Sequence, residues 1–336
     1  MRADMSIFGV KQAEPRTTVS CVGGVDELTN HEWNSFLGSL RPTKSGYETP
    51  EGCVYEVTDD VLGNGGESTV YVCRKVSGNQ CSVKAFAIKE IHDGVMTDER
   101  YSLKLLKKSP IVDTVPAADV TDMSRQRKVY RIAMPMFDGT IDDLYKNGVF
   151  SKPQTLHVMK QTIKICNDLK NAGLSYTDMK PQNILYYACG TPDTDSTVPI
   201  TIRLGDLGSI GEINSKYQSS TTLPPPDISY SPTTAEAFML WSCGATMCIL
   251  LCHGYGLSND EIYRMTSPLY WNNIQESEEP KSEQRKQLVG IAQGIFKDRG
   301  YSRELCERFM GTETEMTHST FNDVLVMLED LESECP

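Results

Sequence analysis

Three side chains of complementary chemistry lie close together in the stretch YTDMKPQNIL, residues 176–185. Asp178 provides a carboxylate, Lys180 a cation and Asn183 a carboxamide, and Pro181 keeps a helix from running through them. A carboxylate can accept a proton from a hydroxyl, an ammonium group can neutralise developing negative charge, and an amide oxygen can bind a hard metal ion. Together these groups favour in-line transfer of a phosphoryl group from a nucleotide.

A further carboxylate that suits metal binding follows in LGDLGS, where Asp206 stands between a strand pattern and a glycine-bearing turn. Asn183 and Asp206 would supply few protein ligands, which suits Mg²⁺, because phosphates and water complete its octahedron. We therefore predict Asn183 and Asp206 as metal ligands. Asp178 is the predicted base that orients an attacking hydroxyl, and Lys180 the group that neutralises charge on the transferring phosphoryl group.

The stretch LGNGGESTVYV, residues 62–72, places Gly63, Gly65 and Gly66 between two strand patterns. Without Cβ atoms, the backbone N–H groups of such a turn can approach a phosphate closely. A plain hairpin turn would explain the same glycines. A dinucleotide-binding motif is disfavoured, because a strand pattern follows and not a helix.

A charged pair is predicted just after this turn. Lys89 lies among the apolar strand residues of FAIKEI and needs a partner if it is buried, which Glu99 at the start of the next helix pattern can provide. Taken singly, an edge-strand lysine and a glutamate that favours a helix N-terminus explain the two residues as well. Together with the glycine turn, they predict a site that holds phosphates.

The remaining sequence predicts the elements that would position these groups. Strand patterns occupy residues 53–91, a short helix is predicted over 97–108, and a further strand over 129–137. Helical patterns follow over 141–150 and 153–173, with Gly173 at the C-cap, and again over 229–334; two short strands, NILYY and TIRLGD, flank a loop at 189–198. A β-rich front third and an α-rich back half predict an α+β fold.

The composition is that of a globular protein with one large domain or two lobes. The chain has 336 residues, 39% hydrophobic and 23% charged, with a formal net charge of −12, so the overall charge favours neither nucleic acid nor an anionic membrane as a partner. The sixteen residues 237–252 carry no charge. They fall short of the ~20 residues of a membrane span, so we predict a buried core helix and no membrane insertion.

The eleven cysteines are scattered, odd in number and without a CxxC pair. This pattern predicts reduced thiols in an intracellular, reducing compartment, the cytoplasm or nucleus. The N-terminal MRADMSIFGVKQ has too short an apolar stretch for a signal peptide.

In this order the motifs resemble those of the eukaryotic-type protein kinase family over about residues 55–331. Gly63, Gly65 and Val70 resemble its glycine-rich loop, Lys89 the lysine of its VAIK strand, and Glu99 the partner of that lysine. Asp178, Lys180 and Asn183 resemble the catalytic loop, and Asp206-Leu207-Gly208 stands where the family has Asp-Phe-Gly. The lysine two residues after the catalytic aspartate is typical of the serine/threonine branch. Trimmed, divergent members of the family occur in large DNA viruses and parasites.

The resemblance implies a two-lobed fold, with a small antiparallel β-rich N-lobe over residues 51–137 and a large helical C-lobe over 138–336. Residues 1–50 would then be an N-terminal extension and a candidate docking segment for a partner. ATP and Mg²⁺ are the implied cofactors, and a protein is the implied substrate. Met134 would be the gatekeeper, and Pro135, Met136 and Phe137 the hinge. The implied ATP-binding residues are Leu62, Gly63, Gly65, Gly66, Val70, Ala87, Lys89, Met134, Pro135, Met136 and Phe137, and Asp178, Lys180, Lys89 and Glu99 would be catalytic.

The chain also departs from the family pattern. Tyr176-Thr177 replaces His-Arg, so no arginine is left at position 177 to bind an activation-loop phosphate. Ser68 replaces the third loop glycine, and Met239 replaces the aspartate of the αF helix. Pro225-Pro226-Asp227 replaces Ala-Pro-Glu, and Thr317-His318 stands where an arginine usually pairs with the Ala-Pro-Glu glutamate. These losses spare the groups that would contact ATP, which favours a divergent serine/threonine kinase. An inactive pseudokinase that acts as a scaffold is the alternative. A small-molecule kinase is a third class, but such enzymes usually lack a lysine two residues after the catalytic aspartate, where this chain has Lys180.

Overall fold

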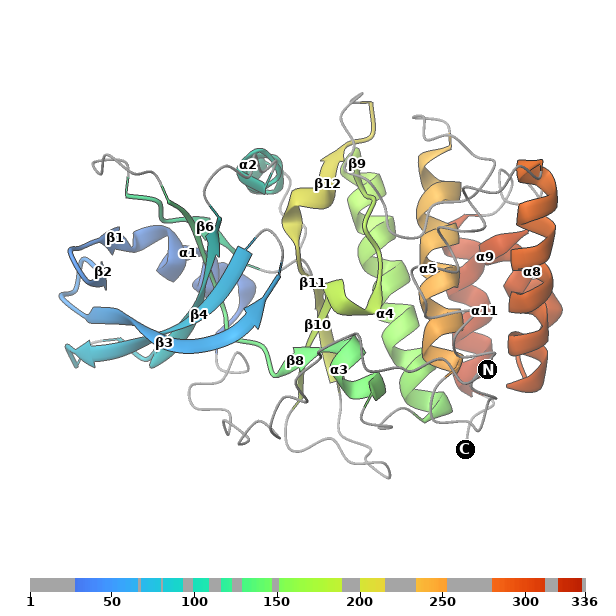
Figure 1. The fold of residues 1–336 in the computed structure, drawn as a ribbon, viewed down its shortest axis with the longest axis horizontal. Coiled ribbons are helices and arrows are strands. Elements are labelled where there is room, and N and C mark those ends of the chain that lie inside the picture. Colours follow the sequence, from blue (N-terminus) through green and yellow to red (C-terminus); the bar gives the residue numbers. More distant parts are fainter. Residues whose placement is uncertain are drawn as a thin grey trace, which may run out of the picture.

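The structure, a computed structural model, describes residues 28–65, 68–79, 81–92, 99–108, 116–122, 129–146, 151–188, 200–214, 234–252, 280–311 and 320–333. Within these ranges the chain forms a small lobe built on one curled sheet and a large lobe built mainly of helices (Figure 1). The chain passes from one lobe to the other between β7 (Tyr130–Met134) and β8 (Gly139–Thr140). This two-lobed α+β architecture confirms the predicted fold class.

The sheet of the small lobe has seven antiparallel strands in the order β1-β2-β3-β4-β5-β7-β6. The other strand bounds are β1 Arg41–Pro42, β2 Gly46–Glu48, β3 Val54–Asn64, β4 Ser68–Ser77, β5 Ala85–Ile91 and β6 Ala118–Asp119. Successive strand residues point to opposite faces, so Phe86 and Ile88 of β5 lie on one face, and Ala87 and Lys89 on the other. The two faces have different partners.

Helix α1 (Asn30–Ser39) packs on the face of Phe86 and Ile88. It begins with a capping box, in which the Glu32 N–H donates to the Thr29 hydroxyl and the Thr29 N–H donates to the Glu32 carboxylate. Trp33, at 2% exposure, lies in the hydrophobic core that contains Phe86 and Ile88. Helix α1 therefore covers the outer face of the small-lobe sheet.

Residues 30–48, predicted as part of an N-terminal extension, add this helix and two strands to the small lobe. β1 pairs with β2, and β2 pairs with β3, with Tyr47 opposite Tyr55. Residues 1–27 of the extension lie outside the described residues, so the docking role predicted for the extension stays a prediction.

The large lobe has the long helices α4 and α5 at its centre, with three more helices packed beside them (Figure 1). The bounds are α3 Ile141–Lys146, α4 Lys152–Asn171, α5 Ala235–Cys252, α8 Lys281–Asp298, α9 Arg303–Met310 and α11 Phe321–Ser333. Glu236 joins three of them, because it pairs with Lys170 of α4 and accepts the N–H of Phe321 of α11 at 2.8 Å. After α4, Gly173 takes a φ of 74°, a left-handed conformation that favours glycine and ends the helix.

Helix α5 is apolar on all sides. Its 18 residues have a mean hydropathy of 1.6 and are long enough to cross a membrane, but 94% of the segment is buried inside the large lobe. A helix that is hydrophobic all round is typical of the core of a large protein. The prediction of a buried core helix over 237–252 is confirmed.

The eight cysteines of the described residues are free thiols, and seven of them are buried. The sulfur atoms of Cys166 in α4 and Cys243 in α5 lie 3.9 Å apart. Burial raises the pKa of Cys73 and of Cys306 to about 12, so both remain protonated near neutral pH. These thiols act as small core residues.

Candidate active site

Lys89 lies between two carboxylates at the junction of the lobes. Its Nζ is 2.7 Å from Glu99 Oε2 and 3.0 Å from Asp206 Oδ1. β5 presents Lys89 on the face opposite α1, helix α2 (Glu99–Lys108) presents Glu99 from its first turn, and Asp206 precedes the short helix η3 (Leu207–Ser209). The structure thus joins three predicted site residues that are far apart in sequence.

This cluster has two carboxylates and one cation, and therefore a formal charge of −1. Burial raises the pKa of Glu99, which is 3% exposed; Lys89 opposes this shift and Asp206 adds to it. Burial lowers the pKa of Lys89, but attraction to Glu99 and Asp206 outweighs it, so the pKa lies above its ordinary value. Asp206 is 45% exposed, so the uncompensated negative charge faces the open side of the cluster, where a cation would be stabilised.

The predicted ATP-binding residues of the small lobe share the face of Lys89. Val70 of β4 lies directly opposite Lys89, and Met134 of β7 directly opposite Ala87. Val70, Ala87 and Met134 thus lie beside Lys89 on one face of the sheet, and their roles in binding ATP stay predictions.

The glycine-rich loop is a hairpin between β3 and β4. Gly63 pairs with Val70, and the Gly65 N–H donates to the Ser68 carbonyl at 2.9 Å. Leu62 is the extra residue of a β-bulge, because Val61 and Gly63 pair with the adjacent Tyr71 and Val70. A Cβ on Gly63 would meet no atom within 4 Å, so that side of the loop is open. Gly66 lies outside the described residues.

The hinge follows β7. Pro135 is buried, and Met136 and Phe137 are half-buried. Phe137 lies against Tyr187 of β10 (Ile184–Ala188), with ring centroids 6.2 Å apart, so the large lobe supports the end of the hinge. Pro135 has no N–H, which leaves its carbonyl and the backbone groups of Met136 and Phe137 for a bound adenine.

The catalytic-loop residues form one hydrogen-bonded group between β9 (Leu174–Tyr176) and the short helix η2 (Pro181–Asn183). Lys180 Nζ donates to Asp178 Oδ2 at 2.7 Å. Asn183 Nδ2 donates to the same Oδ2 at 2.8 Å and to the Asp178 carbonyl at 2.9 Å. Asp178 is 7% exposed, so these bonds hold a nearly buried carboxylate in one orientation.

Asn183 and Asp206 fit the predicted metal site. Because Asn183 donates through Nδ2, its Oδ1 is the amide atom that can bind a cation. The Gly205 N–H donates to the Asn183 carbonyl at 2.8 Å, which holds the residue before Asp206 beside Asn183. One carboxylate and one amide oxygen suit Mg²⁺ that takes its other ligands from phosphates and water.

Tyr176 holds the catalytic loop against Asp206, a role that the sequence analysis did not assign. Its buried hydroxyl donates to the Gly205 carbonyl at 2.9 Å, one residue before Asp206. Its N–H donates to the thioether sulfur of Met239 in α5 at 3.4 Å. A tyrosine in a buried strand needs a partner for its hydroxyl, and this requirement could have marked the residue.

Thr177, which replaces the family's arginine, bonds to the segment after Asp206. Its N–H and its hydroxyl donate to the Ser209 carbonyl at 3.2 and 3.4 Å. Of the other departures, Pro225-Pro226-Asp227 and Thr317-His318 lie outside the described residues.

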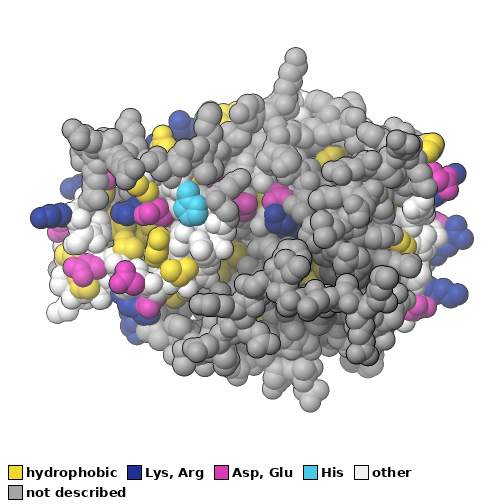
Figure 2. All heavy atoms as spheres, viewed as in Figure 1, with side chains coloured by type: hydrophobic (Ala, Val, Ile, Leu, Met, Phe, Trp, Pro, Cys, Tyr) yellow, Lys and Arg dark blue, Asp and Glu magenta, His cyan; other side chains and the backbone are white. Residues whose placement is uncertain are grey.

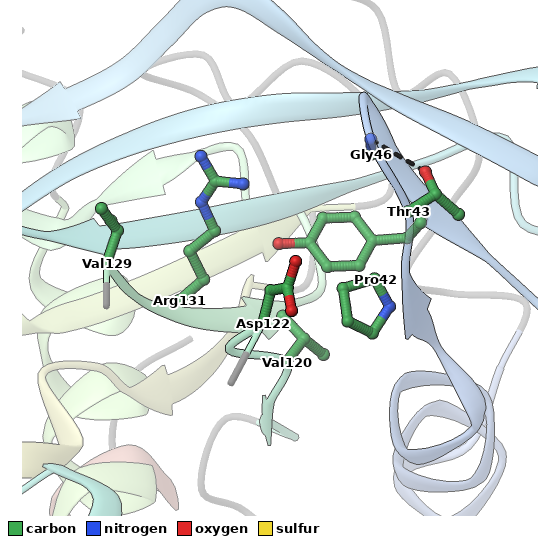
Figure 3. A pocket seen from close by; sticks show the side chains of 8 residues that line it. Pro42, Thr43, Gly46, Val120, Asp122, Val129 and Arg131 are labelled. Carbon is green, nitrogen blue, oxygen red and sulfur yellow. Dashed lines mark hydrogen bonds between the residues drawn. The ribbon is translucent and has the colours of Figure 1, made fainter. Parts of the chain in front are cut away.

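A cavity of about 170 Å³ lies elsewhere in the small lobe (Figure 3). It is lined by Pro42, Thr43, Gly46, Tyr47, Val120, Asp122, Val129 and Arg131. Arg131 Nε donates to Glu90 Oε2 at 2.8 Å. The buried Tyr47 hydroxyl has no hydrogen bond of normal geometry among the described residues; burial raises its pKa to about 12 although Arg131 lowers it, so the hydroxyl stays neutral. None of the predicted catalytic or ATP-binding residues lines this cavity.

Figure 2 shows charged side chains of both signs on one face of the molecule. There, the lysine and arginine side chains of the described residues are interspersed with aspartates and glutamates.

Comparison with known proteins agrees with the geometry of the site. Residues 56–312 match the protein kinase domain. Calcium/calmodulin-dependent protein kinase type 1 of Caenorhabditis elegans is 25% identical over 249 residues, which cover 68% of this chain and 68% of that kinase. Calcium-dependent protein kinase 3 of Plasmodium berghei is 25% identical over 263 residues, which cover 72% of this chain and 43% of that kinase.

The chain therefore spans about two thirds of the nematode kinase and less than half of the Plasmodium kinase. The dependence on calcium in those names describes those proteins. The matched range contains the glycine-rich loop, the Lys89–Glu99 pair, the catalytic loop and Asp206. From its sequence match and its two-lobed fold, the chain belongs to the protein kinase family.

Proposed function

We propose that this chain is an active serine/threonine kinase that transfers the γ-phosphoryl group of ATP to hydroxyls of protein substrates. The observation that carries this proposal is the closed arrangement of the site: Lys89 bonds both Glu99 and Asp206. In protein kinases, the lysine–glutamate pair and the aspartate of the Asp-Phe-Gly position must both be in place for transfer.

Each residue then has a defined task. Lys89 binds the phosphates of ATP, and Glu99 holds the Lys89 ammonium in position. Asp178 orients the substrate hydroxyl and accepts its proton as the oxygen attacks the γ-phosphorus. Lys180, 2.7 Å from Asp178, neutralises charge on the transferring phosphoryl group. ADP is the leaving group.

Asn183 and Asp206 would hold Mg²⁺, which supplies electrostatic stabilisation of the phosphate charge. Asp206 is 45% exposed, so its carboxylate could bind the metal while Oδ1 keeps its bond to Lys89. We also propose that the protein acts in an intracellular, reducing compartment, because all eight described cysteines are free thiols and seven of them are buried.

The test is a radiolabelled ATP assay on purified protein with one basic and one acidic protein substrate, followed by analysis of the labelled amino acid. We expect label on serine or threonine with wild type and none with Asp206→Asn. Glu304→Gln is the matched control, because it also neutralises a carboxylate, but one that is 65% exposed on α9. Equal incorporation by wild type and Asp206→Asn would refute the assignment, and an inactive wild type would favour the scaffold.

A further inference from the structure

One face of helix α2 runs along the segment that follows Asp206. Glu99, Ser102, Leu103 and Leu106 are spaced i, i+3, i+4 and i+7, which places them on one side of the helix. Ser102 is 0% exposed and Leu103 4% exposed, and Leu106 packs on the large hydrophobic core. This face therefore points into the protein, toward η3 and β12 (Ile210–Glu212) (Figure 1).

A hydrogen bond connects this face to the segment: the Ser102 hydroxyl donates to the Ile210 carbonyl at 2.5 Å. Three residues earlier in both elements, the backbone of Leu207 stabilises the ionised Glu99 carboxylate and so opposes the rise in its pKa. Successive positions of α2 therefore lie along successive positions of the segment. The Ser102 bond is fully buried, where a hydrogen bond is strong and an unmade one is costly.

The opposite side of the same segment is bound to the catalytic loop. β12 pairs antiparallel with β9, with Ile210 opposite Tyr176, and Thr177 donates to the Ser209 carbonyl. Residues 209–212 are thus held between α2 and the catalytic loop by backbone groups and hydroxyls. None of the bonds named here that hold residues 209–212 uses a charged side chain.

We propose that Ser102 is a positioning residue that locks α2 onto the start of the activation segment, and so keeps Glu99 beside Lys89 without a phosphate. This inference deepens the proposed function, since its consequence for catalysis rests on it. The serines and threonines that could carry a regulatory phosphate, Ser215, Ser219, Ser220, Thr221 and Thr222, lie outside the described residues. Ser102 is not among the predicted ATP-binding residues, so its proposed effect on catalysis comes through the position of Glu99.

The experiment compares Ser102→Ala with Ser242→Ala. Ser242 is the matched control because it is equally buried, at 1% exposure. Its hydroxyl donates to the Phe238 carbonyl of the same helix, α5, so this bond does not link two secondary-structure elements. We measure hydrogen exchange of the amides of residues 99–108, the melting temperature, and kcat and KM for ATP after phosphatase treatment. The exchange measurement needs no catalysis.

In Ser102→Ala we expect exchange within α2 to rise about three- to tenfold, the range given by one net hydrogen bond, with a matching fall in kcat/KM for ATP. Ser242→Ala should leave both unchanged even if both variants melt at a lower temperature. Ser102→Thr, which keeps the hydroxyl, should restore slow exchange.

Equal exchange of α2 in the two alanine variants would overturn the role of Ser102, whether or not the protein transfers phosphate. A loss of tenfold or more of wild-type activity on phosphatase treatment would overturn the phosphate-free part. If wild type is inactive but Ser102→Ala still loosens α2, the proposed function fails and the coupling stands.

Discussion

Removing the ammonium of Lys89 should destabilise the protein as well as inactivate it. In Lys89→Met, Glu99 stays 3% exposed and loses its 2.7 Å partner. Removing one partner of a buried ion pair typically costs about 3–5 kcal/mol, because the other charge stays buried without compensation. With roughly 2 °C of melting temperature per kcal/mol for a large chain, we expect a fall of about 6–10 °C.

A double-mutant cycle with Glu99→Gln isolates this effect. In wild type, Glu99→Gln should lower the melting temperature, since Lys89 keeps only Asp206 at 3.0 Å as a charged partner. In Lys89→Met the same change should raise it, because it removes the uncompensated carboxylate. The sign of the Glu99→Gln effect thus depends on whether Lys89 is present.

The pH dependence gives a second check on the cycle. Burial already raises the pKa of Glu99, and loss of Lys89 removes the main opposing interaction. A carboxyl group whose pKa is raised in the folded state binds protons more tightly there than in the unfolded chain. Stability therefore rises as pH falls from that raised pKa toward the unfolded value. The deficit of Lys89→Met should shrink between pH 7 and about pH 5.

Differential scanning fluorimetry at several pH values measures these melting temperatures for wild type, Lys89→Met, Glu99→Gln and the double variant. Phosphoryl transfer should be absent from both variants that lack Lys89. If Glu99→Gln changes the melting temperature by the same amount in both backgrounds, Glu99 and Lys89 do not form a buried pair in solution, and the argument for the closed site fails.

Three further predictions concern other groups. ATP with Mg²⁺ should raise the melting temperature of wild type more than ATP with EDTA, and this difference should vanish in Asp206→Asn; an equal shift with and without metal would contradict the metal site. Tyr47→Phe should leave the melting temperature unchanged or raise it, because it removes a buried hydroxyl without a hydrogen bond of normal geometry; a clear fall would mean that Arg131 bonds it. Hydrogen bonds from Thr121 and Arg100 outweigh the effect of burial and hold the pKa of Asp119 below its ordinary value of 3.8, so the stabilisation by this carboxylate is present above pH 3.8 and is lost below. The melting-temperature deficit of Asp119→Asn should therefore shrink on acidification toward pH 3. A deficit independent of pH would refute this.

Local patterns in the sequence predicted the strands, the buried helix and the catalytic-loop residues, whereas the two-lobed fold and the place of Asp206 followed from the resemblance to the protein kinase family. Strand alternation placed Lys89 among apolar neighbours, and the spacing of Asp178, Lys180 and Asn183 fixed one hydrogen-bonded loop. The apolar run over 237–252 could be buried or cross a membrane; its length favoured burial, and the 94% burial of α5 in the large lobe confirms it. Such features need no knowledge of distant contacts.

The supporting contacts could not be predicted in the same way. Ser102 is one serine among many until the tertiary structure brings Ile210 to it, 108 residues later in the chain. The packing of α1 on the outer face of the sheet depends on how seven strands curl, which no local pattern specifies. Likewise, the hydroxyl of Tyr176 gains a meaning only through the Gly205 carbonyl. These contacts decide how firmly the site is held.

The replacement of charged family residues by Met239 and Thr177 has a physical logic in this fold. Met239 lies in α5, where a carboxylate would have to be buried at 1% exposure and would need N–H donors to compensate its charge. The Met239 thioether accepts a weak hydrogen bond from the Tyr176 N–H and carries no charge that would have to be desolvated. Thr177 likewise binds the Ser209 carbonyl with neutral groups. At positions 177 and 239, apolar packing and neutral hydrogen bonds thus support the catalytic loop. Charged side chains are kept at Lys89, Asp178, Lys180 and Asp206, where they would interact with a nucleotide and a metal ion.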